Sequence, residues 1–354
     1  MKILHVTATH LKPEGGVPVV LKNLVLEQNK IKNFEAMVIS LVAPVKEMGS
    51  KYFEYVPIKE FNKYIVNYNP DYVILHSFYY LEYNKVVKIL NQKKIKYFIE
   101  PHGSFGKAAM KKSKLKKIIA NSTIFKKQIK NSFGIIFLNE SEKKDSVYRT
   151  DHDIIIPNGI NIDSSFRKSV CDRKNKLYFI GRYDIKHKGL DYLFNAFDIL
   201  EQQHFKVEIE FWGNGDYKSC HYLNSRIKKM KYVKVNINNS IFGKNKDFHL
   251  EQLGIMLLTS RYEGFPMTIL EAWFYGNPSI VTYGTNVSSE IVNNNLGWFT
   301  EFDPYSIADT IKKATKEYKK NRSKYIINCK KYVKNNYSWE KIAKLSYKEL
   351  KKWM

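Results

Sequence analysis

Two glutamates stand out in a stretch that is otherwise rich in apolar residues. Glu263 and Glu271 are separated by seven residues within RYEGFPMTILEAWFYGNPSIVT, residues 261–282. The stretch is predicted to be a turn followed by a helix, so a rise of about 1.5 Å per residue places the carboxylates roughly 10 Å apart. The carboxylate pair of a retaining glycosidase is only about 5 Å apart. The spacing therefore favours contacts with the two ends of one elongated ligand.

Each glutamate also has a purely structural interpretation. Thr268 and Glu271 match the spacing of a helix capping box. Glu263 fits an ordinary loop carboxylate next to a helix N-terminus. Taken alone, each residue is better explained by its structural role, so a functional assignment depends on the groups that surround the pair.

An anion site is predicted at the start of the same helix. Pro266 lies near the helix start, where free backbone amides and the positive end of the helix dipole attract anions. The amides expected to be free are those of Gly264, Phe265 and Met267. Arg182 and Lys188 flank another predicted turn, and both side chains suit phosphate oxygens. Two ordinary surface cations would look the same, but together with the helix amides they could hold a diphosphate without a metal.

These residues have to be positioned by sheets. Short apolar segments alternate with amphipathic ones along the chain, which predicts parallel strands joined by crossover helices. The first half has predicted strands at residues 2–8, 36–43, 71–77, 96–103 and 133–139. The second half has them at residues 153–161, 177–184, 207–216, 253–260 and 278–284. Helices are predicted around residues 19–30 and 190–203 and from Ile307 onwards.

Because the pattern restarts once, the predicted fold class is α/β with two doubly wound, Rossmann-like domains that face each other across a cleft. The boundary is expected near residues 157–175. The first domain is predicted to span residues 1–165 and the second residues 166–334, with a C-terminal helix at about 335–354 packing back on the first. Residues of interest recur at the predicted strand ends: Gly16, His76, His102, Gly181, Gly213 and Gly264.

With these motifs in place, the chain resembles the retaining glycosyltransferases of family 4, which have the GT-B fold. The segment EGFPMTILEAWFYGNPSIV, with its two glutamates, is similar to the family signature, and IGRYDIKHKG resembles the phosphate-binding motif. Further matches are EGGVPVV, EPHG, IIPNGIN, FWGNGD, SSEIV, LGWF and YSWEKIAK. The resemblance is strong over residues 154–345 and looser over residues 1–150. Asn161 stands where the family pattern has an aspartate, and Asp163 follows it.

The resemblance implies a role for each matching position. Arg182 and Lys188 should bind the diphosphate of the donor and stabilise the leaving group, while Glu263 and His102 should lie by the transferred sugar. Glu271 should bind the ribose hydroxyls, and Gly16 should lie near the diphosphate and the acceptor. The implied catalytic residues are Glu263, His102, Arg182 and Lys188. The implied donor-binding residues are Gly16, Arg182, Lys188, Gly213, Glu263, Gly264, Phe265, Pro266, Met267, Thr268 and Glu271. No metal and no cofactor is implied.

The implied reaction is the transfer of a hexosyl or N-acetylhexosaminyl unit with retention, from a nucleoside diphosphate sugar to a glycan hydroxyl. A UDP-sugar is the expected donor, and a growing, lipid-linked surface glycan of bacterial type is the expected acceptor. Cations and helix amides would stabilise the charge that develops on the departing diphosphate. The sequence has no evident nucleophile, which favours a same-face displacement. A nucleotide-sugar epimerase or phosphorylase is the alternative on the same fold, and a non-catalytic basic binding protein is a third class.

The net charge of +25 favours binding to anionic partners. Residues 107–130 contain nine lysines, and no acidic residue occurs between Glu100 and Glu140. This segment is predicted to contact an anionic membrane surface, with a solvated helix as the alternative. No motif supports nucleic-acid binding. The expected location is cytoplasmic, peripheral on the inner face of the cell membrane, because no signal peptide or spanning segment is recognised.

Other metal or disulfide chemistry is disfavoured. The three cysteines lie far apart and form no CxxC motif, which argues against a disulfide framework and a cysteine-based zinc site. The nine histidines form no HExxH motif. The triplet Asp151-His152-Asp153 has the form of a metal-binding DxD motif, but it immediately precedes the predicted interdomain strand. No metal site is therefore predicted.

Overall fold

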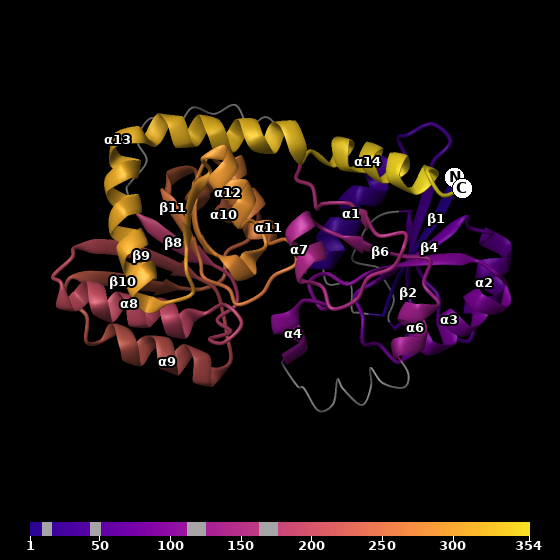
Figure 1. Ribbon diagram of the computed structural model, residues 1–354, viewed down its shortest axis with the longest axis horizontal. Helices are drawn as coiled ribbons and strands as arrows, with labels where there is room; N and C mark the ends of the chain where they lie inside the picture. The colour runs from indigo at the N-terminus through magenta and orange to yellow at the C-terminus, as the bar shows by residue number, and fades with distance from the viewer. Residues whose placement is uncertain (9–15, 43–50, 112–124, 163–175) are drawn as a thin grey trace. The chain divides into compact units, whose positions relative to one another are not determined.

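A computed structural model describes residues 1–8, 16–42, 51–111, 125–162 and 176–354 of the chain. The chain divides into two compact units. The first unit consists of Met1–Asn161 together with Tyr337–Met354, and the second unit is Ile162–Asn336. Each unit is a parallel sheet with helices packed on it (Figure 1). The predicted boundary after residue 165 falls among residues 163–175, which lie outside the described residues.

The first unit contains a seven-stranded parallel sheet with the order β3-β2-β1-β4-β5-β6-β7. Its strands are β1 (Lys2–Thr7), β2 (Glu35–Ser40), β3 (Phe53–Tyr55), β4 (Tyr72–His76), β5 (Lys96–Glu100), β6 (Gly134–Phe137) and β7 (Ile154–Ile155). The inner strands are apolar and buried on both faces, as expected for parallel strands covered by helices on either side. The strand order reverses at β1 and β4, and such a switch point is where ligands bind in open α/β sheets.

The helices of the first unit include its last segment in the chain. They are α1 (Gly16–Gln28), α2 (Phe61–Tyr68), α3 (Glu82–Gln92), α4 (Lys107–Lys111), α6 (Lys126–Lys130), α7 (Glu140–Asp145) and α14 (Trp339–Lys351). Helix α14 starts after the N-cap Ser338, whose Oγ accepts a hydrogen bond from the Lys341 amide. It packs against α1 (Figure 1), and the Tyr347 ring lies 5.2 Å from the Phe34 ring.

The second unit contains a six-stranded parallel sheet with the order β10-β9-β8-β11-β12-β13. Its strands are β8 (Leu177–Ile180), β9 (Val207–Trp212), β10 (Val233–Asn238), β11 (Ile255–Leu258), β12 (Ser279–Thr282) and β13 (Gly297–Thr300). Its helices are α8 (Leu190–Gln202), α9 (Tyr217–Ile227), α10 (Gly243–Gln252), α11 (Met267–Phe274), α12 (Ser288–Asn294) and α13 (Pro304–Asn336). Helix α13 is kinked at Asn321, which has non-helical backbone angles.

Two glycines allow the carboxyl ends of the strands in this second sheet to approach closely. A Cβ on Gly213, just after β9, would lie 2.0 Å from the carbonyl oxygen of Gly181, just after β8. Gly189 has a left-handed φ of 64°, and a Cβ there would lie 2.0 Å from the carbonyl oxygen of Thr259. No side chain fits at either position, so the turns after β8, β9 and β11 are held together at one edge of the sheet.

The basic segment is only partly described. Helices α4 and α6 belong to it, whereas residues 112–124 lie outside the described residues. The described lysine side chains at 107, 126, 127 and 130 are exposed. Within the described ranges, every helix is too short or too polar to cross a bilayer.

Candidate functional site

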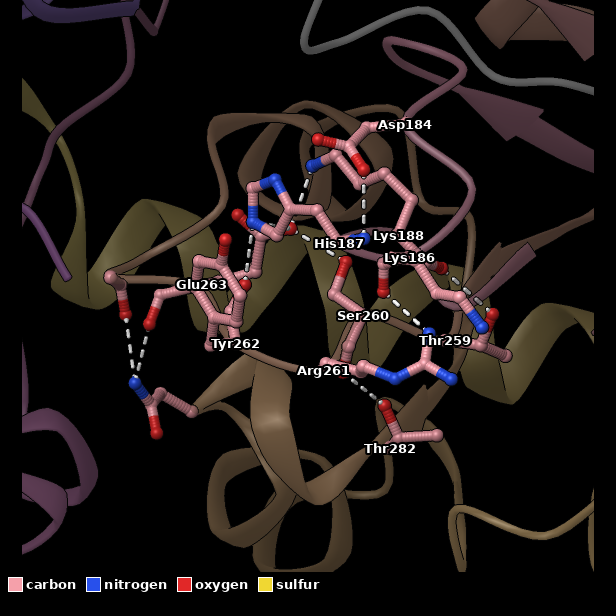
Figure 2. Close-up of polar contacts among 12 residues, drawn as sticks. Asp184, Lys186, His187, Lys188, Thr259, Ser260, Arg261, Tyr262, Glu263 and Thr282 are labelled. Carbon is pink, nitrogen blue, oxygen red and sulfur yellow. Dashed lines mark hydrogen bonds and ion pairs between the residues drawn. The ribbon is translucent and has the colours of Figure 1, made fainter. Parts of the chain in front are cut away.

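The first element of the site is a carboxylate in the turn between β11 and α11. Oε1 of Glu263 accepts hydrogen bonds from Lys188 Nζ at 2.6 Å and from Ser260 Oγ at 2.6 Å (Figure 2). The side chains of Glu263 and Lys188 are only 12% and 13% exposed. Burial alone would raise the pKa of Glu263, but the charge of Lys188 and the two hydrogen bonds lower it below its ordinary value. Glu263 is therefore an ionised carboxylate held in an ion pair.

His187 lies next to the Lys188–Glu263 pair. Its ring stacks on the Tyr262 ring, with centroids 4.2 Å apart and planes 19° apart. Nε2 of His187 lies 2.8 Å from the carbonyl oxygen of Tyr262 and 4.0 Å from Oε1 of Glu263. Because a carbonyl only accepts, this nitrogen carries the proton and Nδ1 keeps its lone pair. Burial is the largest influence on the pKa of His187 and lowers it, so the ring is neutral at neutral pH.

A bidentate clamp joins the two turns that supply these groups. The guanidinium of Arg261 donates to both oxygens of Asp191, at 2.8 and 2.9 Å, and also to the backbone oxygen of Lys186. The Arg261 amide donates to the His187 carbonyl oxygen at 2.9 Å. Thr282 Oγ1 bonds the carbonyl of Ser260 from the neighbouring strand (Figure 2). The turns that carry Lys188 and Glu263 are thus held in place by hydrogen bonds of other residues.

The start of helix α11 lies directly after Glu263. The helix begins at Met267 with Pro266 as its N-cap, and no side chain caps it. Thr268 is therefore inside the first turn, which rules out the capping box considered for Thr268 and Glu271. The predicted helix start at Pro266 is confirmed, and Gly276 ends the helix with a left-handed φ of 79°.

Glu271 has a partner that sequence reasoning did not find. Its Oε1 accepts from Nζ of Lys246, on α10, at 2.6 Å. Both side chains are half-buried, at 23% and 19% exposure. Nothing in the sequence around Lys246 distinguishes it from Lys244, the other lysine of α10, because its role follows from the contact between α10 and α11.

Arg182 and Gly213 lie at the ends of β8 and β9. Arg182 is exposed and lines a cavity of about 520 Å³. The cavity is lined by Arg182, Tyr183, Asp184, Asn214, Gly215, Asp216 and Ser219. Gly16 is the first residue of α1, with no atom within 4 Å of where its Cβ would be. The rest of the N-terminal glycine loop, residues 9–15, lies outside the described residues.

The remaining predicted site residue, His102, belongs to the first unit. It follows β5 with a left-handed φ of 48°, and the next residue, Gly103, has a φ of 81°. Its Nε2 lies 3.2 Å from His76 Nδ1, and its Nδ1 lies 3.6 Å from Oε1 of Glu100. The sequence places His76 and His102 at the ends of predicted strands but gives no signal for His5, which the sheet brings into the same buried row.

The buried row has strongly perturbed titration. Burial lowers the pKa of His5 and of His102 to about 4, and it lowers that of His76 well below its ordinary value. Burial and the neighbouring Glu142 raise the pKa of Glu100 to about 8. His76, Glu100 and His102 also place side-chain nitrogens and oxygens within 4.8 Å of one another, which among the described residues is the one group with the composition of a metal site. All three histidines are neutral at neutral pH.

The Asp151-His152-Asp153 triplet has structural partners. Oδ1 of Asp153 accepts from the amides of Ile135 and Thr150, and its Oδ2 accepts from Nε of Arg149 at 2.9 Å. Nδ1 of His152 lies 3.1 Å from a backbone oxygen. Asn161, which replaces the aspartate of the family pattern, donates to Asn23 Oδ1 at 3.2 Å, and Asp163 lies outside the described residues.

Comparison with known proteins gives this geometry a context. Residues 161–332 match the family model described as glycosyl transferases group 1. Over 239 residues the chain is 30% identical to an uncharacterized glycosyltransferase of Methanocaldococcus jannaschii, covering 60% of this chain and 58% of that one. The alignment thus spans little more than half of this relative's length.

Two longer matches cover most of the chain. It is 24% identical over 336 residues to an uncharacterized 41.2 kDa protein in the cps region of Klebsiella pneumoniae, covering 86% and 87% of the two chains. The structure of Anabaena HepE in complex with UDP superposes with a TM-score of 0.75 at 14% identity, covering 99% of this chain and all of that one. The two parallel sheets with their helices are those of the GT-B fold.

Proposed function

We propose that this chain is a glycosyltransferase that takes its sugar from a nucleoside diphosphate donor. The observation that carries the proposal is the buried Lys188–Glu263 pair beside the N-terminus of α11, within the residues that match the glycosyltransferase model. We further infer that the enzyme is a retaining member of family 4, because both signature glutamates and the Arg182–Lys188 motif are present. The comparisons do not favour the epimerase or phosphorylase alternative, since the matched model and the archaeal relative are both described as glycosyltransferases.

In the proposed mechanism Lys188 and Arg182 bind the diphosphate and stabilise the negative charge that develops as it leaves. A cation that is already oriented contributes more than one that must reorganise during the reaction. Lys188 is oriented in advance by Glu263, which itself is fixed by Ser260. The uncapped N-terminus of α11 adds its dipole to the same region.

Retention is proposed without a covalent intermediate. A nucleophilic carboxylate would have to leave its partners to reach the sugar. Glu263 is ionised but engaged by two donors at 2.6 Å, so it serves better to orient Lys188 and contact the transferred sugar. The incoming hydroxyl then attacks from the face that the diphosphate leaves, and its proton passes to a departing phosphate oxygen. This route requires no metal, and we propose that none is used.

The donor is proposed to be a UDP-sugar that carries a hexosyl or N-acetylhexosaminyl unit. The complex of Anabaena HepE with UDP supports the choice of nucleotide, because that protein has the same fold. Glu271 is proposed to bind the ribose hydroxyls, with Lys246 keeping its carboxylate oriented. Gly213, Pro266 and the amides of Gly264, Phe265, Met267 and Thr268 complete the proposed donor site, together with Gly16.

The acceptor is proposed to be a hydroxyl of a growing surface glycan, carried on a lipid. The relative from the cps region of Klebsiella pneumoniae supports a role in polysaccharide synthesis. A lipid-linked acceptor would bring the enzyme to the inner face of the cell membrane, where the exposed lysines at 107, 126, 127 and 130 suit anionic lipid. We therefore propose a peripheral enzyme on the cytoplasmic side.

A thermal-shift screen against nucleotide sugars tests the proposal most directly. A true donor should raise the melting temperature, since it binds the folded state only. Lys188→Ala should lose this shift, whereas Lys186→Ala should retain it, because the Lys186 side chain is 80% exposed and bonds Asp191 instead. Equal shifts for both variants and the wild type would contradict the site assignment.

A further inference from the structure

A continuous row of hydrogen bonds runs through the core of the first unit. It starts on α14, passes through α1, β1 and the end of β4, and ends in the turn after β5. The members are Ser346, Gln28, His5, His76 and His102. The first four are buried, and the His102 side chain is 13% exposed. We call this row the histidine chain.

The direction of the first bonds is fixed by Ser346. Its hydroxyl donates to the backbone oxygen of Ala343 at 2.7 Å, so Oγ receives the hydrogen bond from Gln28 Nε2 at 3.2 Å. The amide oxygen of Gln28 then faces His5 Nε2 at 3.1 Å. Since this oxygen only accepts, the proton of His5 is on Nε2 and its Nδ1 carries a lone pair.

The same reasoning carries through the next two rings. Nδ1 of His5 lies 2.8 Å from Nε2 of His76, so His76 donates from Nε2. A neutral imidazole has one proton, which leaves Nδ1 of His76 as an acceptor. That atom is hydrogen-bonded to Nε2 of His102 at 3.2 Å and also lies 3.3 Å from Oε2 of Glu100. We assign the proton of this hydrogen bond to Nε2 of His102. The proton of His102 is on Nε2, and its Nδ1 is the open end of the chain.

We propose that the histidine chain sets the tautomer of His102, so that its Nδ1 accepts a hydrogen bond from a hydroxyl of the bound substrate. Ser346, Gln28, His5 and His76 are positioning residues in this scheme, since they act only through His102. The substrate contact rests on the proposed function, whereas the tautomer does not. Oε1 of Glu100 is 3.6 Å from Nδ1 of His102, too far for a hydrogen bond, so the lone pair is available.

The backbone around His102 is consistent with a fixed contact point. His102 and Gly103 both have left-handed φ values, and such a conformation in a non-glycine residue persists only when its surroundings hold it. The ring of His102 is held by His76. The amide of Gly103 donates to Glu142 Oε1 at 2.6 Å, and the other oxygen of Glu142 accepts from the Leu138 amide at 2.6 Å.

A bound metal is the competing explanation for the same cluster. His76, Glu100 and His102 have the right composition. The hydrogen bond between His76 and His102, however, already occupies the lone pair of His76 Nδ1 that a metal would need. The row also contains His5, Gln28 and Ser346, which a three-residue metal site would not require. The histidine chain gives each of its five residues a hydrogen-bonding role.

Nitrogen-15 NMR of the histidine rings in ligand-free protein tests the tautomer directly. The three rings should each show a protonated Nε2 and an unprotonated Nδ1. A protonated Nδ1 on His102, or stoichiometric zinc in the purified protein, would overturn the proposal. This result does not depend on any activity, so it stands whether or not the glycosyltransferase assignment is correct.

A matched pair of variants tests the chain itself. His5→Gln can donate to Gln28 and accept from His76, whereas His5→Leu can do neither. In His5→Leu the tautomers of His76 and His102 should become mixed, and in His5→Gln they should stay as in the wild type. Sugar transfer should fall about tenfold in His5→Leu, as for the loss of one hydrogen bond, while UDP binding stays unchanged. Equal losses of sugar transfer in the two variants, both folded equally well, would contradict the proposed role of the histidine chain.

Discussion

Lys188 and Glu263 lie 75 residues apart in the sequence and form a 2.6 Å ion pair at the carboxyl edge of the second sheet. The pair joins the turn after β8 to the turn after β11, so the two segments that carry the proposed site are linked to each other directly. The pair therefore contributes to stability as well as to the proposed chemistry.

The stability of this pair can be measured separately from activity. Lys188→Ala should lower the free energy of unfolding by about 3 kcal/mol, because it leaves the buried Glu263 carboxylate without its partner. Adding Glu263→Gln should restore part of the loss, since the unpaired charge is then gone. Urea unfolding of the single and double variants measures both effects. Additive losses would show that the two side chains are not coupled.

Transfer should depend on Glu263 far more than UDP binding does. Glu263→Gln keeps the size of the side chain but removes the charge that orients Lys188. We expect the turnover number to fall about 100-fold or more, comparable to the removal of one preorganised electrostatic contact. Isothermal titration should find UDP affinity changed by less than tenfold. Lys186→Ala is the control, and full transfer activity in Glu263→Gln would remove this residue from the mechanism.

Glu271 should recognise the ribose. In Glu271→Gln, the preference for UDP over its 2′,3′-dideoxy analogue should shrink by about tenfold, the equivalent of one charge-assisted hydrogen bond. Lys246→Met should reduce the same preference less, because it only frees the carboxylate. Competition binding with both nucleotides measures the ratio. An unchanged ratio in Glu271→Gln would place the ribose elsewhere.

The buried acid beside the histidine chain should make the protein less stable at alkaline pH. Burial and Glu142 raise the pKa of Glu100 from 4.5 to about 8. The folded state therefore holds this proton more tightly than the unfolded chain, and the stability it contributes is complete below about pH 4.5 and is lost as the pH rises towards about 8. Each pH unit within this window changes the free energy of unfolding by about 1.4 kcal/mol.

Glu100→Gln isolates that effect. Between about pH 6 and pH 8 the wild type should lose on the order of 2 kcal/mol more stability than the variant, as determined by urea unfolding at each pH. Glu142, whose pKa burial raises to about 7, remains in both proteins, so the difference between them reports Glu100 together with its coupling to Glu142. Parallel pH profiles of the two proteins would contradict the raised pKa of Glu100.

Membrane attachment should depend on the position of the lysines and not on the total charge. Reversing Lys126, Lys127 and Lys130 should weaken flotation with phosphatidylserine vesicles by at least about tenfold, since each lysine near the surface contributes about 1 kcal/mol. The matched control reverses the exposed lysines of α13 at 313, 316 and 320. Equal weakening in both would indicate a general charge effect, and binding to phosphatidylcholine alone should be absent.

The sequence was sufficient for the α/β fold class and for ten of the strands, although β3, β10 and β13 were not predicted and several predicted strands extend past the observed ends. Apolar runs such as Tyr72–His76 and Leu177–Ile180 leave no alternative to buried parallel strands, and the turn residues that follow them stand out against the lysine-rich background. Motif spacing also placed Glu263 in the turn before α11 and the start of that helix near Pro266, as the structure has them. These are local features, fixed by short segments of the chain.

The partners of those residues could not be predicted in the same way. Lys246 pairs with Glu271 because α10 packs beside α11, and His5 meets His76 because β1 and β4 are neighbours in the sheet. Neither contact leaves a pattern in the sequence. Ser260 and His187 could have been considered from the sequence, because each lies in a recognised motif. Only the folded turn shows that Ser260 contacts the Glu263 carboxylate and that His187 approaches it.

The last helix of the chain, α14, is part of the first unit and supplies Ser346 to its core. During synthesis on the ribosome, the first unit must therefore wait for the whole second unit to emerge before it can be completed. All residues of the second unit, Ile162–Asn336, are synthesised before α14, so this unit can fold before the first unit is complete. A ribosome that stops a few residues before Ser346 would release a chain in which Gln28 lacks its partner on α14, so the core of the first unit would stay incomplete.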